Sequence, residues 1–216
     1  MEEFKEFWKI ARYSRECVVT EKLDGKNGVV LIVESEWQAD PDALVNSGGL
    51  ALYAGSRTRW VTESDDNYGF ARWAKSHAEE LLTGLGVGRH YGEWWGNGIQ
   101  RGYGLENGDK RWSLFNVSRW CLAGSTPALL PSQDPRVVKV QSVLPACVGL
   151  VPVLWSGMFD ALDANAVLAN LERFGSAAVP RYMKPEGIVV YHKAGNVCFT
   201  KTLVKDEEPK GARKRV

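Results

Sequence analysis

Apolar residues of this chain fall mainly in short runs bounded by polar or glycine-rich segments, a pattern typical of half-buried strands. The runs predict strands at Cys17–Glu21, Gly28–Glu34, Leu50–Ala54, His90–Trp94, Arg111–Cys121, Gly187–Tyr191 and Val197–Val204. Pro152 limits the run Leu150–Leu154 to an edge strand at best. The Asp-Gly step in Lys22–Asn27 predicts a tight turn between the first two strands, and the last two strands are expected to form a hairpin.

Apolar residues at helical spacing predict helices at Tyr68–Leu85 and Asp160–Phe174. The segments 38–49, 96–109 and 125–136 are rich in polar residues, glycine or proline and are expected to be loops. Strands outnumber helices, and the two helices lie far apart in the sequence. This arrangement favours an α+β fold, with antiparallel sheets and packed helices, over a doubly wound βαβ fold.

Composition and charge indicate one ordinary globular domain: the chain has 216 residues, 44% of them apolar, and a net charge of +1. We predict a single domain over 1–204 and a charged tail over 205–216, which holds five basic and three acidic residues. Any nucleic-acid affinity therefore requires a local basic patch. No apolar run approaches the roughly 18 residues of a membrane span, and the charged start lacks the apolar part of a secretory signal. We expect a cytoplasmic protein, in a bacterium or a phage host, without membrane contact.

The cysteines and histidines form no recognisable metal or redox motif. Cys17, Cys121, Cys147 and Cys198 are scattered, without a C-x-x-C pair. All but Cys147 lie in apolar runs and are expected to be core residues. The three histidines lack metal-ligand spacing, and the glycine-rich segments match neither a P-loop nor a dinucleotide-binding fingerprint.

The chemistry is carried by a series of short motifs in a particular order. The first, Glu21–Gly28, contains Lys22, Asp24 and Asn27 and by itself would be interpreted as a charged turn. It is followed by Tyr53–Arg57, Gly92–Gln100, Ser113–Val117, Pro185–Val190 and Phe199–Lys201. Together these motifs supply lysines, carboxylates, an arginine and an aromatic ring. Each motif alone is weak evidence, whereas the ordered set is specific.

In this order the motifs resemble those of the covalent nucleotidyltransferase superfamily of polynucleotide ligases and mRNA capping enzymes. The similarity is closest to ATP-dependent RNA ligases of the RNA ligase 2 type, and it extends from Lys22 to about Lys205. Asn27 stands where RNA ligases often have asparagine and DNA ligases usually have arginine. Gly92–Gln100 is similar to the RNA ligase 2 version of its motif.

Two positions depart from the family pattern. The last motif usually has two lysines separated by one residue, but Leu203 stands in the second place after Lys201, and Lys205 is the nearest substitute. Asn116, after the aromatic Phe115, stands where the family often has aspartate.

The resemblance implies an α+β nucleotidyltransferase domain, the ATP-grasp-like adenylation domain of ligases, with antiparallel sheets flanked by helices. It also implies a reaction of three steps. A lysine attacks the α-phosphorus of ATP, AMP then passes to a 5′-phosphate end, and a 3′-hydroxyl displaces AMP to seal the strand. Lys22 would carry AMP as a lysyl-AMP intermediate. Nearby cations would favour its neutral amine and neutralise charge on the phosphate.

The resemblance also assigns roles to individual residues. The catalytic residues would be Lys22, Glu186 and Lys201. The nucleotide would be bound by Glu21, Leu23, Asn27, Arg57, Glu93, Phe115 and Lys205, with Phe115 stacked on adenine. Because carboxylates beside a polyphosphate need a bridging cation, Mg²⁺ or Mn²⁺ would be held by Asp24, Glu93 and Glu186.

The sequence leaves alternatives open. Trp94 and Trp95 would be core residues or would stack on bases, and Arg101, Lys110 and Arg111 are candidates for phosphate contacts. The leading hypothesis is a monomeric ligase acting on nucleic acid with 5′-phosphate and 3′-hydroxyl ends, with RNA favoured. The alternatives are a minimal DNA ligase, a capping guanylyltransferase that uses GTP, and a nucleotide- or RNA-binding module without transfer activity.

Overall fold

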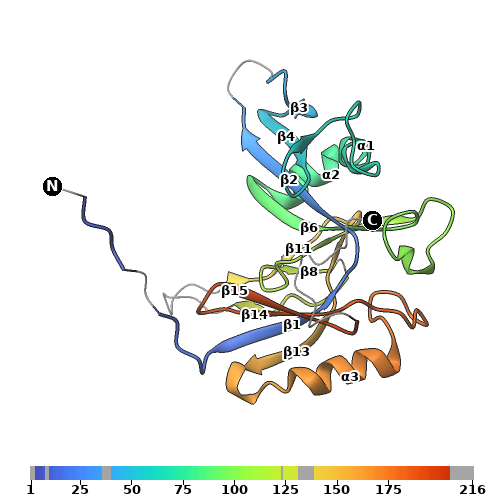
Figure 1. The fold of residues 1–216 in the computed structure, drawn as a ribbon. Helices are drawn as coiled ribbons and strands as arrows, with labels where there is room; N and C mark the ends of the chain where they lie inside the picture. Colours follow the sequence, from blue (N-terminus) through green and yellow to red (C-terminus); the bar gives the residue numbers. More distant parts are fainter. Residues whose placement is uncertain (1–2, 8–9, 36–39, 123, 131–138, 205–216) are drawn as a thin grey trace. The chain divides into compact units, whose positions relative to one another are not determined.

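The computed structural model describes residues 3–7, 10–35, 40–122, 124–130 and 139–204. Strands predominate and a few helices accompany them (Figure 1), which confirms the predicted α+β class. The contacts divide the chain into two compact units. Met1–Lys22 and Pro152–Val216 form what we call the terminal unit, and Leu23–Val151 form the central unit. The tail 205–216 lies outside the described residues.

The terminal unit is built on a four-stranded antiparallel sheet in the order β13-β1-β14-β15. Its strands are β1 (Glu16–Lys22), β13 (Val153–Met158), β14 (Gly187–His192) and β15 (Val197–Thr202). Alternate residues of β1 and β14 form a core with Leu171 of helix α3 (Ala164–Phe174). Helix α3 therefore covers one face of this sheet (Figure 1).

Local sequence signals explain where α3 begins. A short 3-10 helix, η2 (Phe159–Ala161), precedes it, so the predicted helix at Asp160–Phe174 is confirmed except for its first turn. The Asp163 carboxylate accepts hydrogen bonds of 3.0 Å from the N–H groups of Asn165 and Ala166. These bonds satisfy backbone donors that have no partner inside the helix.

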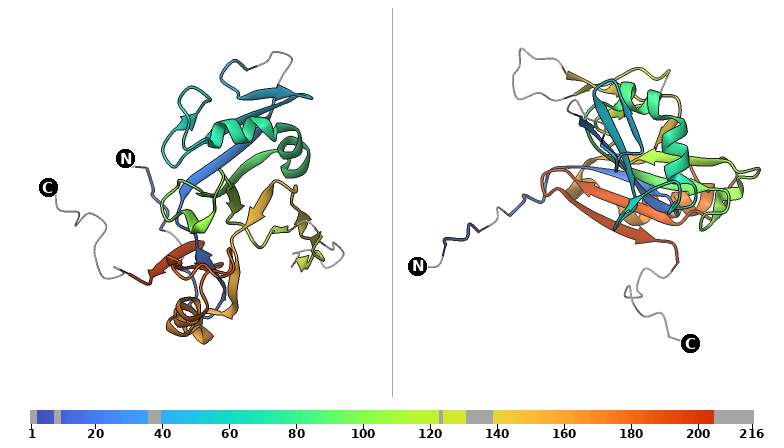
Figure 2. Two further views of the ribbon diagram at one scale, coloured as in Figure 1. Left: turned by 90° about the vertical axis from the view of Figure 1, so that its right-hand side faces the viewer. Right: turned by 90° about the horizontal axis from the view of Figure 1, so that it is seen from above.

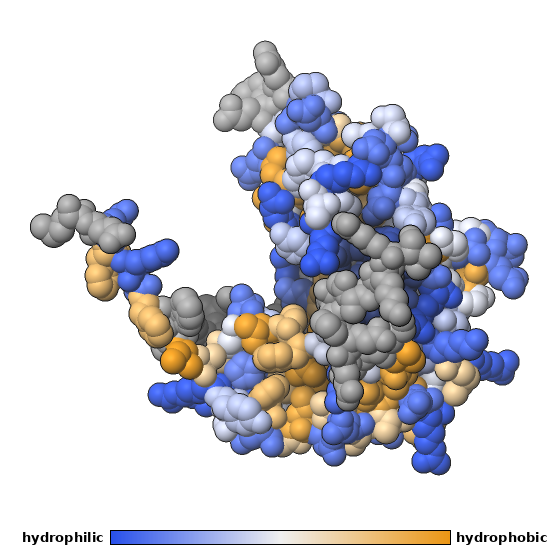
Figure 3. Space-filling view, viewed as in Figure 1, coloured by the Kyte–Doolittle hydropathy of each residue, from blue (hydrophilic) through white to orange (hydrophobic). Residues whose placement is uncertain are grey.

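Strand β15 lies at an edge of its sheet, with β14 as its neighbour among the described strands. Phe199 is 52% exposed and Val197 43% exposed. Figure 3 shows apolar side chains, in orange, on the surface of this unit. Cys198 is exposed as well, so the prediction of a core residue is wrong there, whereas Cys17 and Cys121 are buried as predicted.

The central unit holds a larger sheet, in the order β12-β7-β6-β2-β4-β3, with β5 paired to β4. Its strands are β2 (Lys26–Glu34), β3 (Val45–Ser47), β4 (Leu50–Gly55), β5 (Trp60–Val61), β6 (Gly88–Gly96), β7 (Lys110–Leu114) and β12 (Val148–Leu150). The neighbouring strands are antiparallel except β12 and β7. Smaller elements are η1 (Gly102–Gly104), β8 (Trp120–Cys121), β9 (Leu129–Leu130), β10 (Lys139–Val140) and β11 (Ser142–Val143).

Two helices, α1 (Phe70–Ser76) and α2 (Ala78–Leu85), cover one face of this sheet (Figure 2). Phe70 of α1 packs against the rings of Trp94 and Trp112, with centroids 5.5 and 5.7 Å away. Trp94 and Trp95 are each only 2% exposed. Of the two interpretations of these tryptophans, the structure therefore supports core residues.

The predicted tight turn between the first two strands is wrong. Strand β1 pairs with β13 and β14, whereas β2 pairs with β4 and β6, so the chain passes from one sheet to the other between them. Gly25 is needed for another reason: a Cβ atom built there would lie 2.4 Å from the Trp94 carbonyl oxygen. The Asp-Gly step thus allows close packing against β6 rather than a hairpin.

Several predicted elements are interrupted. The helix expected at Tyr68–Leu85 starts at Phe70 and breaks at His77, where the His77 ring and the Ser76 hydroxyl bond to the Trp73 carbonyl oxygen. Side chains that bond to nearby backbone in this way compete with the helix. The strand expected at Arg111–Cys121 is split into β7 and β8, Pro152 separates β12 from β13, and the predicted loop 38–49 contains β3. The predicted hairpin of β14 and β15 is confirmed.

Within the described ranges, no helix combines the length and the apolar character needed to cross a bilayer.

Candidate active site

Lys22 and Glu186 meet in the terminal unit. Lys22 is the last residue of β1 and lies opposite Gly187, the first residue of β14, so β-sheet pairing brings Glu186 beside it. The distance from Lys22 Nζ to Glu186 Oε2 is 2.5 Å, and the two side chains are 25% and 18% exposed. Oε2 is buried and has no hydrogen-bond partner in the part of the chain that the structure describes, apart from this ion pair.

Gly187 is required beside Glu186 because β15 passes very close. A Cβ atom built on Gly187 would lie 2.2 Å from the carbonyl oxygen of Lys201. Real Cβ atoms do not come that near backbone atoms, so any side chain here would push the strands apart. The Glu-Gly pair of this motif therefore combines a candidate site carboxylate with a packing requirement.

Glu21 anchors the segment that leads toward Glu186. Its side chain is 1% exposed, and Oε2 accepts hydrogen bonds from the N–H groups of Ala177 and Ala178 at 2.8 and 3.1 Å. Burial raises the pKa of the Glu21 carboxyl. The Glu21 carboxylate thus binds backbone N–H groups of its own unit.

Lys201 lies on the opposite face of the sheet from Lys22. Residues directly opposite in an antiparallel sheet share a face, and successive residues alternate between faces. The register places Lys22, Gly187 and Thr202 in one row, and Glu21, Ile188 and Lys201 in the next. The structure therefore does not bring Lys201 beside Lys22.

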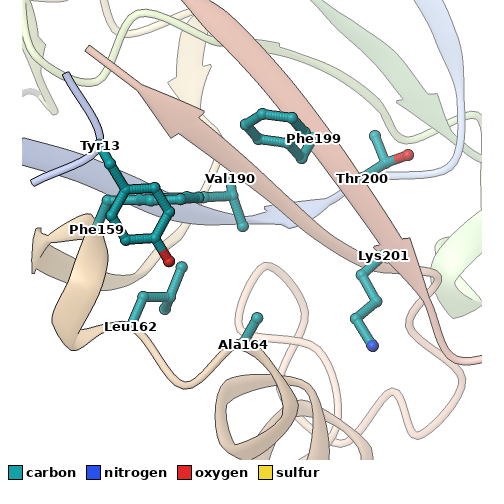
Figure 4. A pocket seen from close by; sticks show the side chains of 8 residues that line it. All are labelled: Tyr13, Phe159, Leu162, Ala164, Val190, Phe199, Thr200 and Lys201. Carbon is teal, nitrogen blue, oxygen red and sulfur yellow. The ribbon is translucent and has the colours of Figure 1, made fainter. Parts of the chain in front are cut away.

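Lys201 instead lines a cavity of about 280 Å³ on the α3 side of the sheet (Figure 4). The other lining residues are Tyr13, Phe159, Leu162, Ala164, Val190, Phe199 and Thr200. On the face of Lys22, the positions two residues apart on β15 are occupied by Thr200 and Thr202. Lys205, the other predicted lysine of this motif, lies outside the described residues.

Glu93 lies in the central unit and holds two residues of the first motif in place. It lies on β6 in register with Asn27, is 9% exposed, and accepts hydrogen bonds from the Gly25 N–H at 3.0 Å and from Asn27 Nδ2 at 3.4 Å. The structure thus brings together two of the predicted site residues, Glu93 and Asn27.

Asp24 is held by the loop that follows β6. Its N–H donates to the Tyr103 hydroxyl at 2.9 Å, and its Oδ2 accepts from Arg101 Nε at 2.9 Å. Tyr103 is buried with a φ of +54°, and its ring packs edge-on against Trp95. Sequence reasoning missed Tyr103, because nothing in a glycine-rich loop indicates which side chain turns inward. It proposed Arg101 as a phosphate contact, and the structure gives it an aspartate partner.

The remaining predicted residues are found in different surroundings. Arg57 is exposed between β4 and β5, with no ion pair or hydrogen bond to another residue of the described ranges. Phe115 follows β7 and is 43% exposed, so it is available for stacking. Leu23 is a core residue, 5% exposed.

Carboxylate oxygens that could bind a divalent metal are present among the predicted site residues, but they do not form a multi-ligand metal site. The described residues contain no group of three or more histidine, cysteine, aspartate or glutamate side chains arranged to hold a metal ion. Taken by itself, each unit nevertheless offers one or two of the predicted carboxylates, the number that Mg²⁺ binds while it keeps several waters. The buried Glu186 Oε2 has no hydrogen-bond partner among the described residues apart from its ion pair with Lys22, so it could bind such an ion.

Comparison with known proteins decides the family. A family model described as RNA ligase matches residues 15–205. The chain belongs to the RNA ligase family. A search of curated proteins finds no match for this family member.

Solved structures of an RNA ligase from Naegleria gruberi share the fold. A variant with AMP and Mn has a TM-score of 0.53 at 17% identity, a variant with ATP and Mn 0.52 at 17%, and the ligase with PPi 0.52 at 18%. Each match covers 88% of this chain and 50% of the Naegleria chain. The RNA ligase family member described here thus spans half the length of the solved structures that it matches.

Proposed function

We propose that this chain is an ATP-dependent RNA ligase that joins 5′-phosphate and 3′-hydroxyl ends through a lysyl-AMP intermediate on Lys22. The observation that carries the proposal is the 2.5 Å contact between Lys22 Nζ and Glu186 Oε2, at the shared end of β1 and β14. Exposed ion pairs are ordinary surface features. This pair is at least three-quarters buried and combines the predicted nucleophile with the predicted acid.

In the first step Lys22 Nζ attacks the α-phosphorus of ATP. A nitrogen–phosphorus bond forms, the bond to the bridging oxygen breaks, and pyrophosphate leaves with the electron pair. The lysine ammonium must first lose a proton to water, and Glu186 Oε2 holds Nζ in position for the attack. The paired strands hold both groups without a flexible loop between them, which limits the entropy lost on reaching the reactive geometry.

In the second and third steps AMP moves from Lys22 to a 5′-phosphate, and a 3′-hydroxyl then displaces AMP. Glu186, with Asp24 and Glu93 by resemblance, would hold Mg²⁺ or Mn²⁺, which when bound neutralises charge on the phosphates. Glu93 also keeps Gly25 and Asn27 in position through its hydrogen bonds. By resemblance Phe115 would stack on adenine, and its exposure supports this role.

The proposal is tested by labelling the protein with nucleotide in the absence of nucleic acid. With α-labelled ATP and Mg²⁺ we expect a labelled protein band, and with α-labelled GTP none. Lys22→Ala should abolish the label, and Glu186→Gln should lower the labelling rate by about 10²-fold or more, because the carboxylate that positions Nζ and would hold the metal ion is lost. Lys193→Ala is the matched control, since Lys193 belongs to the same unit and pairs with Glu16 at 2.8 Å on the surface.

Other outcomes would contradict the proposal. Label that persists in Lys22→Ala would exclude this lysine as the nucleophile. Label from GTP alone would favour a guanylyltransferase, and no label from either nucleotide would favour a binding module. Sealing of RNA ends is expected with the labelled enzyme, whereas sealing of DNA alone would indicate a minimal DNA ligase.

A further inference from the structure

Tyr68 is an exposed aromatic residue held in a conformation that bulky residues rarely adopt. Its φ is +55°, and 49% of its surface is exposed. Two side chains hold its backbone: the Tyr68 carbonyl oxygen accepts hydrogen bonds from Trp94 Nε1 at 3.2 Å and from Lys110 Nζ at 2.8 Å. Glycine or asparagine would fit this backbone at lower cost. A strained and exposed ring points to a function for the ring itself.

Two lysines accompany the ring. Lys26 Nζ lies 5.7 Å from the centroid of the Tyr68 ring, and Lys110 binds the Tyr68 backbone. Within the described ranges, neither lysine forms an ion pair with an acidic side chain. Both charges are therefore available to a ligand, unlike those of Arg59, Arg72 and Lys75 nearby, which have acidic partners.

The sheet register shows that the two lysines lie on one face. Lys26 is opposite Trp94, and Lys110 is opposite Gly96, two residues further along β6. Because alternate residues of a strand share a face, both lysines lie on the face that carries Trp94. Asn27 and Glu93 lie on the other face of the same strands. At this end of the sheet, the two lysines therefore lie on one face, and Glu93 and Asn27 lie on the other.

We propose that Lys26, Tyr68 and Lys110, which we call the Tyr68 patch, bind the RNA substrate as a single strand. The lysines would contact phosphates, and the ring of Tyr68 would stack on a base. Unpaired cations beside an exposed aromatic ring are the combination that grips single-stranded nucleic acid without reading its sequence. An apolar protein partner would not require two uncompensated charges. The inference rests on the proposed function, because it assigns that function's nucleic-acid substrate to a surface.

The test measures binding of a 5′-phosphorylated, fluorescently labelled single-stranded RNA to the full chain by anisotropy, without ATP. Tyr68→Gly should weaken binding about 5- to 150-fold, the range found when one stacked base is lost. Its thermal midpoint should stay close to that of the wild type, because glycine adopts a positive φ without strain. Tyr68→Phe should bind like the wild type.

Salt dependence separates the two kinds of contact. Lys110→Met should lower the slope of log K against log salt concentration by about 0.7, the value for one phosphate contact on a single strand. Tyr68→Gly should leave that slope unchanged. Tyr91→Ala, at a tyrosine that is 53% exposed on β6, and Lys75→Met, at a lysine paired with Glu63, are the matched controls and should bind RNA like the wild type.

The proposal is overturned if Tyr68→Gly binds RNA as tightly as the wild type, or if Lys110→Met leaves the salt slope unchanged. It is also overturned if the wild type does not bind the RNA. None of these outcomes bears on labelling of Lys22 by ATP, which tests the proposed function separately.

Discussion

Asp24 shows how single residues position the motif that contains Lys22. Its N–H donates to the Tyr103 hydroxyl, and its carboxylate accepts from Arg101, both at 2.9 Å. The next N–H along the chain, that of Gly25, donates to Glu93. The segment directly after Lys22 is therefore held by three side chains of β6 and the loop that follows it, and each bond can be removed separately.

Tyr103→Phe removes one of these bonds and keeps the ring. The Asp24 N–H would lose its partner, which costs about 1 kcal/mol for a part-buried donor. We expect a small fall in thermal stability and a labelling rate with ATP that is lower by about tenfold, measured at saturating nucleotide. Tyr91→Phe, at an exposed tyrosine of the same unit, is the control. A labelling rate equal to that of the wild type would show that the Tyr103 bond has no positioning role.

Residue types and their order were sufficient to select the candidate site. They did not predict which partner each site residue would contact. The sequence predicted Lys22, Glu93 and Glu186 as a functional set, and the structure pairs Lys22 with Glu186. It did not predict that the Glu21 carboxylate would bind backbone N–H groups 156 and 157 residues away. Such long-range contacts leave no local pattern in a sequence.

At the scale of elements, His90 links the end of α2 to β6. The His90 ring is 3% exposed, and its Nε2 lies 3.0 Å from the carbonyl oxygen of Gly86, the residue that ends α2. Burial lowers the pKa of His90, and the Gly86 bond and nearby Arg119 have smaller effects. The folded state therefore holds the neutral imidazole.

This environment predicts a loss of stability in acid. Because the pKa of His90 is lower in the folded state than its ordinary value of 6.5, the unfolded chain takes up a proton first as the pH falls. The stability contributed by neutral His90 is full above pH 6.5 and is lost as the pH falls through the folded-state pKa, by up to about 1.4 kcal/mol per pH unit. The free energy of unfolding of His90→Gln, measured by urea titration between pH 5 and 8, should not show this loss as the pH falls. Parallel curves for the two proteins would contradict the assignment.

Element types followed from local patterns, whereas the pairing of strands, apart from the hairpin of β14 and β15, did not. The apolar runs placed most of the main strands within a few residues of their observed bounds, because half-buried strands show alternation over short distances. The exceptions are Arg111–Cys121, which is split into β7 and β8, and Leu150–Leu154, which Pro152 divides between β12 and β13. The Asp-Gly step in the first motif suggested a hairpin, but β1 and β2 belong to different sheets. Lys201 shows the same limit: its strand was predicted, but only the register with β14 reveals which face it occupies.

At the scale of the whole molecule, each unit has its own hydrophobic core. The core of the terminal unit contains Val19, Ile188 and Leu171 of α3, and the core of the central unit contains Phe70 and Leu81 with the surrounding strands. The chain crosses from one unit to the other after Lys22 and again before Pro152. Separate cores predict that a cavity in one unit has local consequences.

Leu171→Ala tests this independence. Leu171 is 4% exposed, so its truncation should cost about 2–5 kcal/mol and speed hydrogen exchange in β1 and β14. Exchange of the amides of β2 and β4 should change little. Leu81→Ala, at a residue of the central core that is 0% exposed, should show the reverse pattern. Equal acceleration in both units by both variants would show that the two cores open together.

The sequence by itself determined the class of the fold, most of the main strands and the set of candidate site residues. These properties are encoded within a few neighbouring residues, as alternation, helical spacing and short motifs. Only the tertiary structure decided that β1 and β2 enter different sheets, that Lys201 and Lys22 lie on opposite faces, and that Tyr103 binds Asp24. These features depend on which distant segments pair, and pairing is settled by the burial and hydrogen bonding of the whole chain rather than by any local pattern.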